Sequence, residues 1–161
     1  MTTDGTGEPP WLDETEQAVW RQYISVMRLL PDRLSASLSR SHGLTLIDYE
    51  VLARLSEAPL RRMRMTELAD RTAQSRSRLS HQINRMETRG LVTREGCEGD
   101  KRGTFAVLTD EGVATIGTVA PSHVDSVREH FIDQLTPAEL TALTDAYTPV
   151  LDKLRLTRDR D

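Results

Sequence analysis

Apolar residues recur at spacings of three and four along most of the chain, which is the period of helices with one buried face. The first such stripe predicts a long helix that ends at His42 and Gly43. Pro31 falls inside this stripe and is expected to kink the helix or to divide it near Leu30. The apolar positions of the stripe are Trp20, Tyr23, Ile24, Met27, Leu30, Leu34 and Leu38.

Three shorter helices are predicted to follow. The first begins at Thr45, with Asp48 as its partner in an approximate capping box, and stops near Pro59. An extended link over residues 61–65 leads to a short helix capped by Thr66, and a fourth helix over residues 75–89 is closed by Gly90. The positions expected to be buried in these helices are Ile47, Val51, Leu52, Leu55, Leu68, Ala69, Leu79, Ile83 and Met86.

The hydrophobic period then changes. Two short β-prone runs, residues 91–94 and 104–108, flank a loop rich in glycine and charge, which indicates a β-hairpin with a projecting loop. A further helix starts at Thr109 and is expected to bend at Pro121. Thr136, followed by a proline and a glutamate, is a strong start signal for a last helix. The stripes of these two helices are Val113, Ile116, Ala120, Val124, Val127 and Phe131, then Leu140, Leu143, Tyr147, Val150, Leu151 and Leu154.

This order of elements predicts a mainly α protein with a small β-hairpin wing, that is, a winged helix-turn-helix with N- and C-terminal dimerisation helices. Residues 45–108 are the expected DNA-binding region. Residues 11–44 and 109–157 form a helical dimerisation region integrated with it in one domain, and residues 1–10 a disordered tail. The outer helices have too little local core to bury their stripes, so a two-fold homodimer is expected.

The charge of the chain is strongly segregated. Its 161 residues carry a net charge of −4. Residues 61–102, however, hold eleven Lys+Arg and six Asp+Glu, a net of +5, which leaves −9 for the remainder. Almost all the basic residues are arginines, whose planar guanidinium bonds bidentately to phosphates and base edges. A basic module in an acidic scaffold favours a nucleic-acid partner.

Other classes of protein fit the sequence poorly. No apolar run approaches the roughly 18 residues of a membrane span, and no secretory signal is visible at the N-terminus. Because Cys97 is the only cysteine, we expect a soluble protein of the reducing cytoplasm. Ser80 and His81 diverge by about 100° on a helix and cannot pair as nucleophile and base. With no phosphate-binding glycine loop, dinucleotide fingerprint or metal-binding cysteine pair, we expect neither an enzyme nor a cofactor.

The candidate contacts with double-stranded DNA lie on the fourth helix and the hairpin. The N-terminal turn of a recognition helix enters the major groove, and a basic wing reaches the minor groove. A solvated helix face and a generic charged turn remain as alternatives. Phosphate contacts are expected from Arg76, Arg78, Arg94 and Lys101, base reading from Ser77, Ser80, His81, Gln82 and Arg85, a further donor from Ser75, minor-groove insertion from Arg102, and orientation of the loop from Asp100.

The run from Met65 to Gly112 resembles the DNA-binding core of the MarR family of bacterial transcriptional regulators. The resemblance rests on three signals in order: residues 89–92 (RGLV), the wing residues 100–102 (DKR), and residues 108–112 (LTDEG). The flanking helices fit the family's dimerisation region, over about Leu12 to Leu156. The resemblance implies an obligate dimer on a pseudo-palindromic operator, with Arg102 in the minor groove supported by Asp100. Many members of the family are repressors that small, often phenolic or anionic, ligands release from DNA, and the resemblance implies that this chain could be controlled in the same way.

The signal that would control such a regulator stays open. Peroxide-sensing members carry a reactive cysteine in the first helix, where this chain has none, and Cys97 falls in the wing loop. His123 and His130 lie two helical turns apart, about 10 Å, too far to share a metal ion. A cavity between the first two helices is a further possibility, although core or interface roles are favoured for its residues, which would be Trp20, Tyr23, Met27, His42 and Tyr49, with Arg21 or Arg28. The alternative function is a winged-helix adaptor that binds other proteins.

Overall fold

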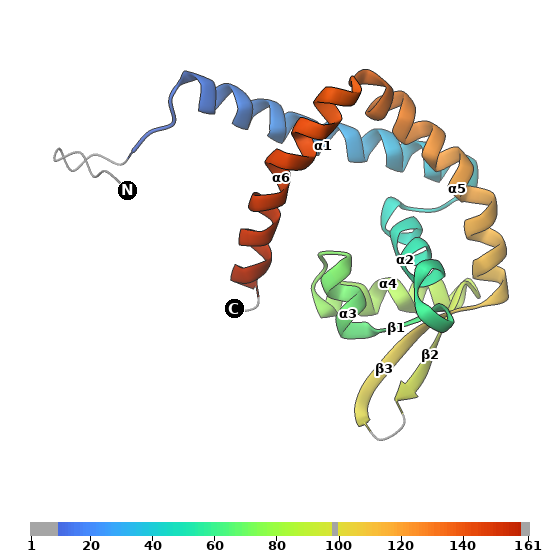
Figure 1. The fold of residues 1–161 in the computed structure, drawn as a ribbon. Coiled ribbons are helices and arrows are strands. Elements are labelled where there is room, and N and C mark those ends of the chain that lie inside the picture. Colours follow the sequence, from blue (N-terminus) through green and yellow to red (C-terminus); the bar gives the residue numbers. More distant parts are fainter. Residues whose placement is uncertain (1–9, 98–99, 159–161) are drawn as a thin grey trace.

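The computed structural model describes residues 10–97 and 100–158, and the side chains of residues 10–96 and 103–155. It confirms the predicted fold class, because a small antiparallel sheet is set among helices (Figure 1). The elements in chain order are α1 (Glu14–His42), α2 (Leu46–Glu57), the 3-10 turn η1 (Pro59–Arg61), β1 (Arg62–Arg64), α3 (Met65–Arg71), α4 (Arg76–Thr88), β2 (Val92–Cys97), β3 (Asp100–Leu108), α5 (Asp110–His130), the 3-10 turn η2 (Ile132–Gln134) and α6 (Pro137–Arg158).

The long helix α1 is continuous. Asp13 and Glu16 form a capping box at its start, and Gly43 ends it in the left-handed conformation with φ 62°. Pro31 lies inside the helix without dividing it, so of the two expected outcomes, a kink or a division near Leu30, the division does not occur. A proline removes one backbone hydrogen bond, and the bonds of the neighbouring turns hold the helix together. Helix α5 also carries an internal proline, Pro121, and follows a curved path (Figure 1).

The sheet has the order β1-β3-β2, with both pairings antiparallel. Strands β2 and β3 are the predicted hairpin, and β3 begins four residues earlier than the predicted run. Strand β1 was expected only as an extended link, yet Met63 pairs with Ala106 of β3. Helix α3 begins at Met65 with no side-chain cap, so the prediction that Thr66 caps it is wrong.

The hydrophobic core lies between the sheet and helices α2, α3 and α4. Val51, Leu52 and Leu55 of α2 are fully buried in it, as predicted. Ile47 was expected beside them but is 41% exposed, because α2 turns that position away from the core. The core also takes Leu38 from α1 and, from α5, Ile116 and Val119. These three residues connect the basic module to the helices on either side of it.

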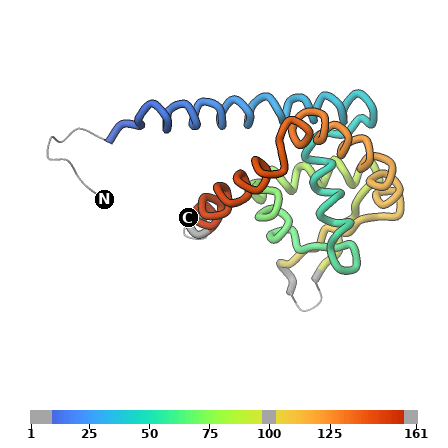
Figure 2. Tube along the Cα trace, turned by 45° about the horizontal axis from the view of Figure 1, so that its top comes forward, coloured from blue at the N-terminus to red at the C-terminus, as the bar shows by residue number. Residues whose placement is uncertain are grey.

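Two helical arms leave the molecule with apolar side chains uncovered. The N-terminal half of α1 extends away from the core, and α6 projects on the same side of the molecule (Figure 2). The arms meet through Tyr23 of α1 and Tyr147 of α6, whose rings are 6.4 Å apart edge to face. Many large apolar residues of the two arms are exposed, namely Val19, Trp20, Tyr23, Val26, Met27, Leu29, Tyr147, Val150, Leu151 and Leu154.

Candidate nucleic-acid interface

Helix α4 presents a polar face that starts at its N-terminus. Ser75 caps the helix, since its Oγ accepts a hydrogen bond from the backbone N–H of Arg78 at 3.3 Å. Leu79 and Ile83 are fully buried and hold the opposite face against the core. The free N–H groups of the first turn add a partial positive charge to that of the arginines. The predicted contact residues that the structure exposes on this face are Ser75, Arg76, Ser77, Arg78, Ser80 and His81.

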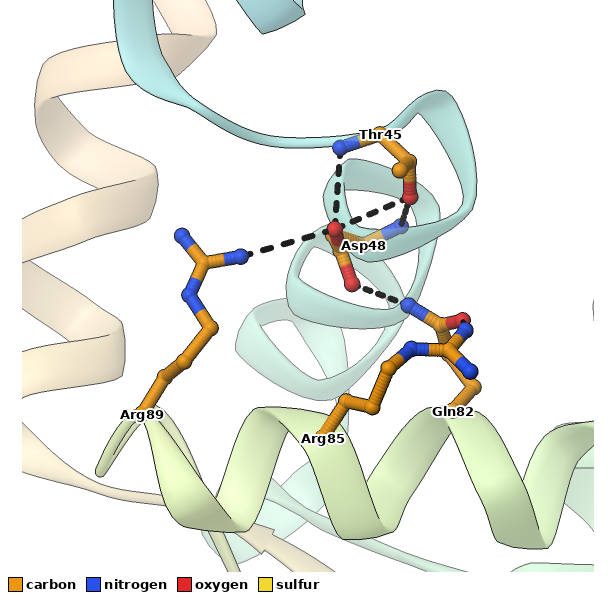
Figure 3. A network of polar contacts seen from close by, with 5 residues as sticks. All are labelled: Thr45, Asp48, Gln82, Arg85 and Arg89. Carbon is orange, nitrogen blue, oxygen red and sulfur yellow. Dashed lines mark hydrogen bonds and ion pairs between the residues drawn. The ribbon is translucent and has the colours of Figure 1, made fainter.

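The prediction that Gln82 lies on the exposed side of α4 is wrong. Gln82 is 4% exposed, and its Nε2 donates a hydrogen bond to Oδ1 of Asp48 on α2 (Figure 3). Its Oε1 accepts one from Nη2 of Arg85. The helical period places Gln82 at the border between the two faces, and the contact with α2 decides which face it joins. Arg85 is exposed, and part of its guanidinium is engaged in this bond.

Arg94 of β2 is turned toward α4. Its Nη2 donates to the backbone carbonyl of Ser80 at 2.9 Å and to the Ser80 hydroxyl at 3.3 Å. Its Nη1 pairs with Oε2 of Glu87 at 2.5 Å and also donates to Oδ1 of Asn84. The side chain is 26% exposed. Arg94 therefore fastens the wing to the recognition helix, and the expected phosphate contact would have to compete with these bonds.

The wing is the hairpin of β2 and β3, and Arg94 lies in its first strand. The backbone of Asp100, Lys101 and Arg102 forms the start of β3, beside the hairpin loop. The side chains of these three residues, and that of Cys97, lie outside the described residues. Their proposed roles at the minor groove, and any redox role of Cys97, remain predictions.

A groove of about 330 Å³ lies between α3, the start of α4 and the base of the wing. It joins the first turn of the recognition helix to the hairpin, which are the two segments predicted to contact DNA. A groove that combines arginines with hydroxyl groups has the donors that a phosphate backbone requires. The residues that line it are Arg64, Met65, Thr66, Arg76, Ser80, Arg94, Gly103 and Thr104.

Strand β1 adds basic residues that the sequence reasoning missed. The guanidinium carbons of Arg62 and Arg64 lie 4.9 and 5.6 Å from the ring centroid of Phe105, so both arginines flank one aromatic ring. Arg62 also pairs with Glu95 at 3.6 Å. Met63 between them is buried. The alternation of basic, apolar and basic residues was the available signal, because neighbours two apart share one face of a strand.

A second polar region lies where α5 packs against α2 and the C-terminal end of α1. The rings of Tyr49 and His123 are 3.9 Å apart between centroids, and the buried Nδ1 of His123 has no hydrogen-bond partner among the described residues. Burial lowers the pKa of His123. Burial and the nearby carboxylate of Glu57 raise the pKa of Tyr49. Nε2 of His42 lies 2.8 Å from the hydroxyl of Ser122, also on α5.

The residues suggested for a ligand cavity do not come together. His42 and Tyr49 lie against α5, whereas Trp20, Tyr23 and Met27 are exposed on the projecting half of α1. The groove between α1 and α5, of about 380 Å³, is lined instead by Arg33, Ala36, Ser37, Arg40, Ser122, Asp125, Ser126, Glu129 and His130. In the described part of the chain, no three His, Cys, Asp or Glu residues are grouped to hold a metal ion. Over the same residues, no helix has the length and apolarity to cross a membrane.

Comparison with known proteins gives the family. A family model described as MarR family matches residues 42–103. The transcriptional regulator HosA of Escherichia coli O127:H6 is 33% identical over 96 residues, which cover 60% of this chain and 69% of HosA. The chain belongs to the MarR family. Its named relatives are transcriptional regulators and not enzymes.

Two solved structures of MarR family regulators from Streptomyces coelicolor resemble this family member along nearly its whole length. AbsC is 54% identical with a TM-score of 0.87, over 91% of this chain and 99% of AbsC. Sco3205, whose structure was solved in complex with DNA, is 46% identical with a TM-score of 0.88, over 92% of this chain and 93% of Sco3205. At these identities the similarity extends to the projecting helices as well as to the basic module.

Proposed function

We propose that this MarR family regulator binds double-stranded DNA sequence-specifically, as a homodimer on a pseudo-palindromic operator, and acts as a repressor. The observation that carries the proposal is the exposed first turn of α4, where Arg76, Ser77 and Arg78 lie beside an arginine-lined groove that leads to the wing. The DNA complex of Sco3205, which is 46% identical, supports the same use of this module. A DNA-binding regulator of this kind belongs in the cytoplasm.

Each part of the interface has a proposed task. Arg76 and Arg78 contact phosphates, together with Lys101, and base edges are read by Ser77, Ser80, His81 and Arg85. Ser75 caps the helix and orients its first turn. Arg102 enters the minor groove with Asp100 beside it. Gln82 and Arg94 act from within, because their described bonds hold α4 against α2 and the wing against α4.

The homodimer is proposed from the two apolar arms. Trp20 of α1 is 54% exposed, and Leu151 and Leu154 of α6 are 47% and 59% exposed. An apolar surface shared by two helices that project from the core is a candidate interface, and a second copy of the chain would cover it. Residues 11–44 and 109–157 are therefore proposed as the dimerisation region around a DNA-binding region at 45–108. Two-fold symmetry would set the recognition helices about one DNA turn apart.

The test is fluorescence anisotropy with a labelled duplex from the region upstream of the gene, titrated at several salt concentrations beside a scrambled duplex. We expect binding about a thousandfold tighter than to the scramble, weakening steeply with salt. Arg102→Ala should cost roughly 1–3 kcal/mol of operator binding. Arg54→Ala on α2, where the side chain is 42% exposed, is the matched control. Absence of binding at low salt would favour the alternative, a winged-helix adaptor that binds other proteins.

Control by a small phenolic or anionic ligand belongs to the proposal on the ground of the family alone, and no residue of this chain is assigned to it. The same anisotropy assay detects it: an effector would dissociate the complex with the operator at a fixed protein concentration. Repression is tested separately, with a reporter gene behind the bound duplex. Expression should rise when the regulator is deleted, and a fall would mark an activator.

A further inference from the structure

Asp48 is a buried carboxylate at the start of α2 that is bonded to three other residues (Figure 3). It is 4% exposed. Its Oδ2 accepts hydrogen bonds from the backbone N–H and the hydroxyl of Thr45, both at 2.9 Å, and lies 3.6 Å from Nη1 of Arg89. Its Oδ1 accepts a hydrogen bond from Nε2 of Gln82. One oxygen thus serves the cap and the end of α4, and the other serves the middle of α4.

The carboxylate of Asp48 determines which way the amide of Gln82 points. A carboxylate only accepts hydrogen bonds, so the NH₂ group of Gln82 has to face Asp48. The carbonyl oxygen of Gln82 then points away from Asp48 and accepts from the guanidinium of Arg85. The orientation of the amide follows from this hydrogen-bond network, as for any buried glutamine. The acceptor offered to Arg85 is therefore set by a residue on another helix.

The same carboxylate also holds the far end of α4. Gln82 and Arg89 are seven residues apart, which is two helical turns, so both face α2. Asp48 is thereby bonded to the middle and to the C-terminal end of the recognition helix. Arg85 lies between these two anchors and is exposed. Without an acceptor beside it, its long side chain would sample many rotamers.

We propose that Asp48 is a positioning residue for DNA recognition: through the amide of Gln82 it fixes the guanidinium of Arg85 in the orientation that reads a base. The proposal rests on the proposed function, because it assumes that α4 reads the major groove. It assigns Asp48, which touches no DNA, a share of the sequence specificity. In this proposal Gln82 connects the two residues: its NH₂ group donates to Asp48, and its carbonyl oxygen accepts from Arg85.

The chain offers a variant that reverses this polarity, at the cost of the ion pair between Asp48 and Arg89. In Asp48→Asn, the remaining carbonyl oxygen can keep the bonds to Thr45, and the new NH₂ group faces Gln82. The amide of Gln82 must then turn over and present its own NH₂ group to Arg85, which is itself only a donor. Adding Gln82→Glu restores an acceptor toward Arg85. The double variant Asp48→Asn/Gln82→Glu has the same net charge as the natural chain.

The experiment uses the full-length protein and duplexes that the natural chain selects from a randomised pool, with scrambled duplexes as the non-specific probe. We expect Asp48→Asn to lower the ratio of specific to non-specific affinity about tenfold, within the range for one lost base contact. The double variant should recover most of that ratio. In an Arg85→Ala background, Asp48→Asn should have no further effect on the ratio. Glu139→Gln, at the capping box of α6, is the matched control and should leave the ratio unchanged.

Other outcomes overturn the proposal. If the affinity ratio is unchanged in Asp48→Asn, Asp48 only stabilises the fold. The same holds if the ratio falls, the double variant does not restore it, and both variants have a lower Tm. If Asp48→Asn is too unstable to assay, Gln82→Leu removes the same acceptor, and its loss should equal that of Arg85→Ala and not add to it. Additive losses would refute the coupling. If the natural chain selects no sequence at all, the proposed function fails and takes this proposal with it.

Discussion

Arg94 allows the internal and the DNA-contacting arginines of the module to be separated. Arg94→Met keeps the aliphatic part of the side chain and removes bonds to Ser80, Glu87 and Asn84. Hydrogen bonds to charged groups contribute about 1.5–3 kcal/mol each when buried. Because the side chains of Arg94 and Glu87 are 26% and 29% exposed, water replaces part of the loss. We therefore expect unfolding to become easier by about 2–3 kcal/mol in total.

The assay pairs Arg94→Met with Arg76→Met, an exposed arginine in the first turn of α4. For a chain of this size, the expected loss lowers Tm by roughly 4–12 °C, measured by calorimetry at one protein concentration. The salt dependence of DNA binding should hardly change in Arg94→Met. In Arg76→Met, the Tm should stay and the slope of log K against log salt should fall by about 0.9 per protomer. If Arg94→Met instead keeps its Tm and lowers that slope, Arg94 contacts DNA and does not hold the wing against α4.

Three further predictions follow from other parts of the fold. Leu143→Asp with Leu151→Asp should convert the dimer to a folded monomer in sedimentation, since each places a charge in the proposed interface; an intact dimer would exclude α6 from it. Burial lowers the pKa of His123, so the unfolded chain takes up its proton first and stability is lost as the pH falls below 6.5. His123→Phe should flatten this loss in chemical denaturation at pH 7.5 and 5.5, and an identical loss would show that His123 does not cause it. A Cβ at Gly112 would lie 2.2 Å from the backbone oxygen of Leu91, so Gly112→Ala should cost about 3 kcal/mol or more in denaturant unfolding, and a neutral result would contradict the packing.

The sequence predicted elements whose signals are local. The capping boxes at Thr45 and Thr136, and the glycines that end α1 and α4, are confirmed, because each depends on residues within one turn. Strand β1 was missed, since three residues show little periodicity and their partner, β3, lies about forty positions later. The uncovered stripes of α1 and α6 were expected as dimer helices, and that expectation awaits the sedimentation experiment.

Within the candidate site, the sequence separated exposed from buried residues only where the helical period is unambiguous. Leu79 and Ile83 were correctly placed inside, and Arg76 and Ser77 outside. Gln82 was misplaced because its burial depends on the carboxylate of Asp48, 34 positions earlier. The sequence of α4 alone gives no signal for that contact. Arg94 was misplaced for the same reason. An arginine followed by a glutamate in a hairpin is typical of an exposed position, and only the packing of α4 against the wing shows that Arg94 bonds to Ser80 and Glu87.

The joint between β3 and α5 fixes the start of α5 against the residues that follow α4. The hydroxyl of Thr109, the residue that caps α5, donates to the carbonyls of Gly90 and Leu91, at 2.6 and 3.0 Å, and Gly112 lies hard against Leu91. The far half of α5 packs along α1. A helix of 21 residues is about 31 Å long, so a tilt of about 10° at one end displaces the other by about 5 Å. A displacement of that size exceeds the length of a hydrogen bond, so even a small change of tilt where α5 meets Leu91 would break contacts between the other end of α5 and α1.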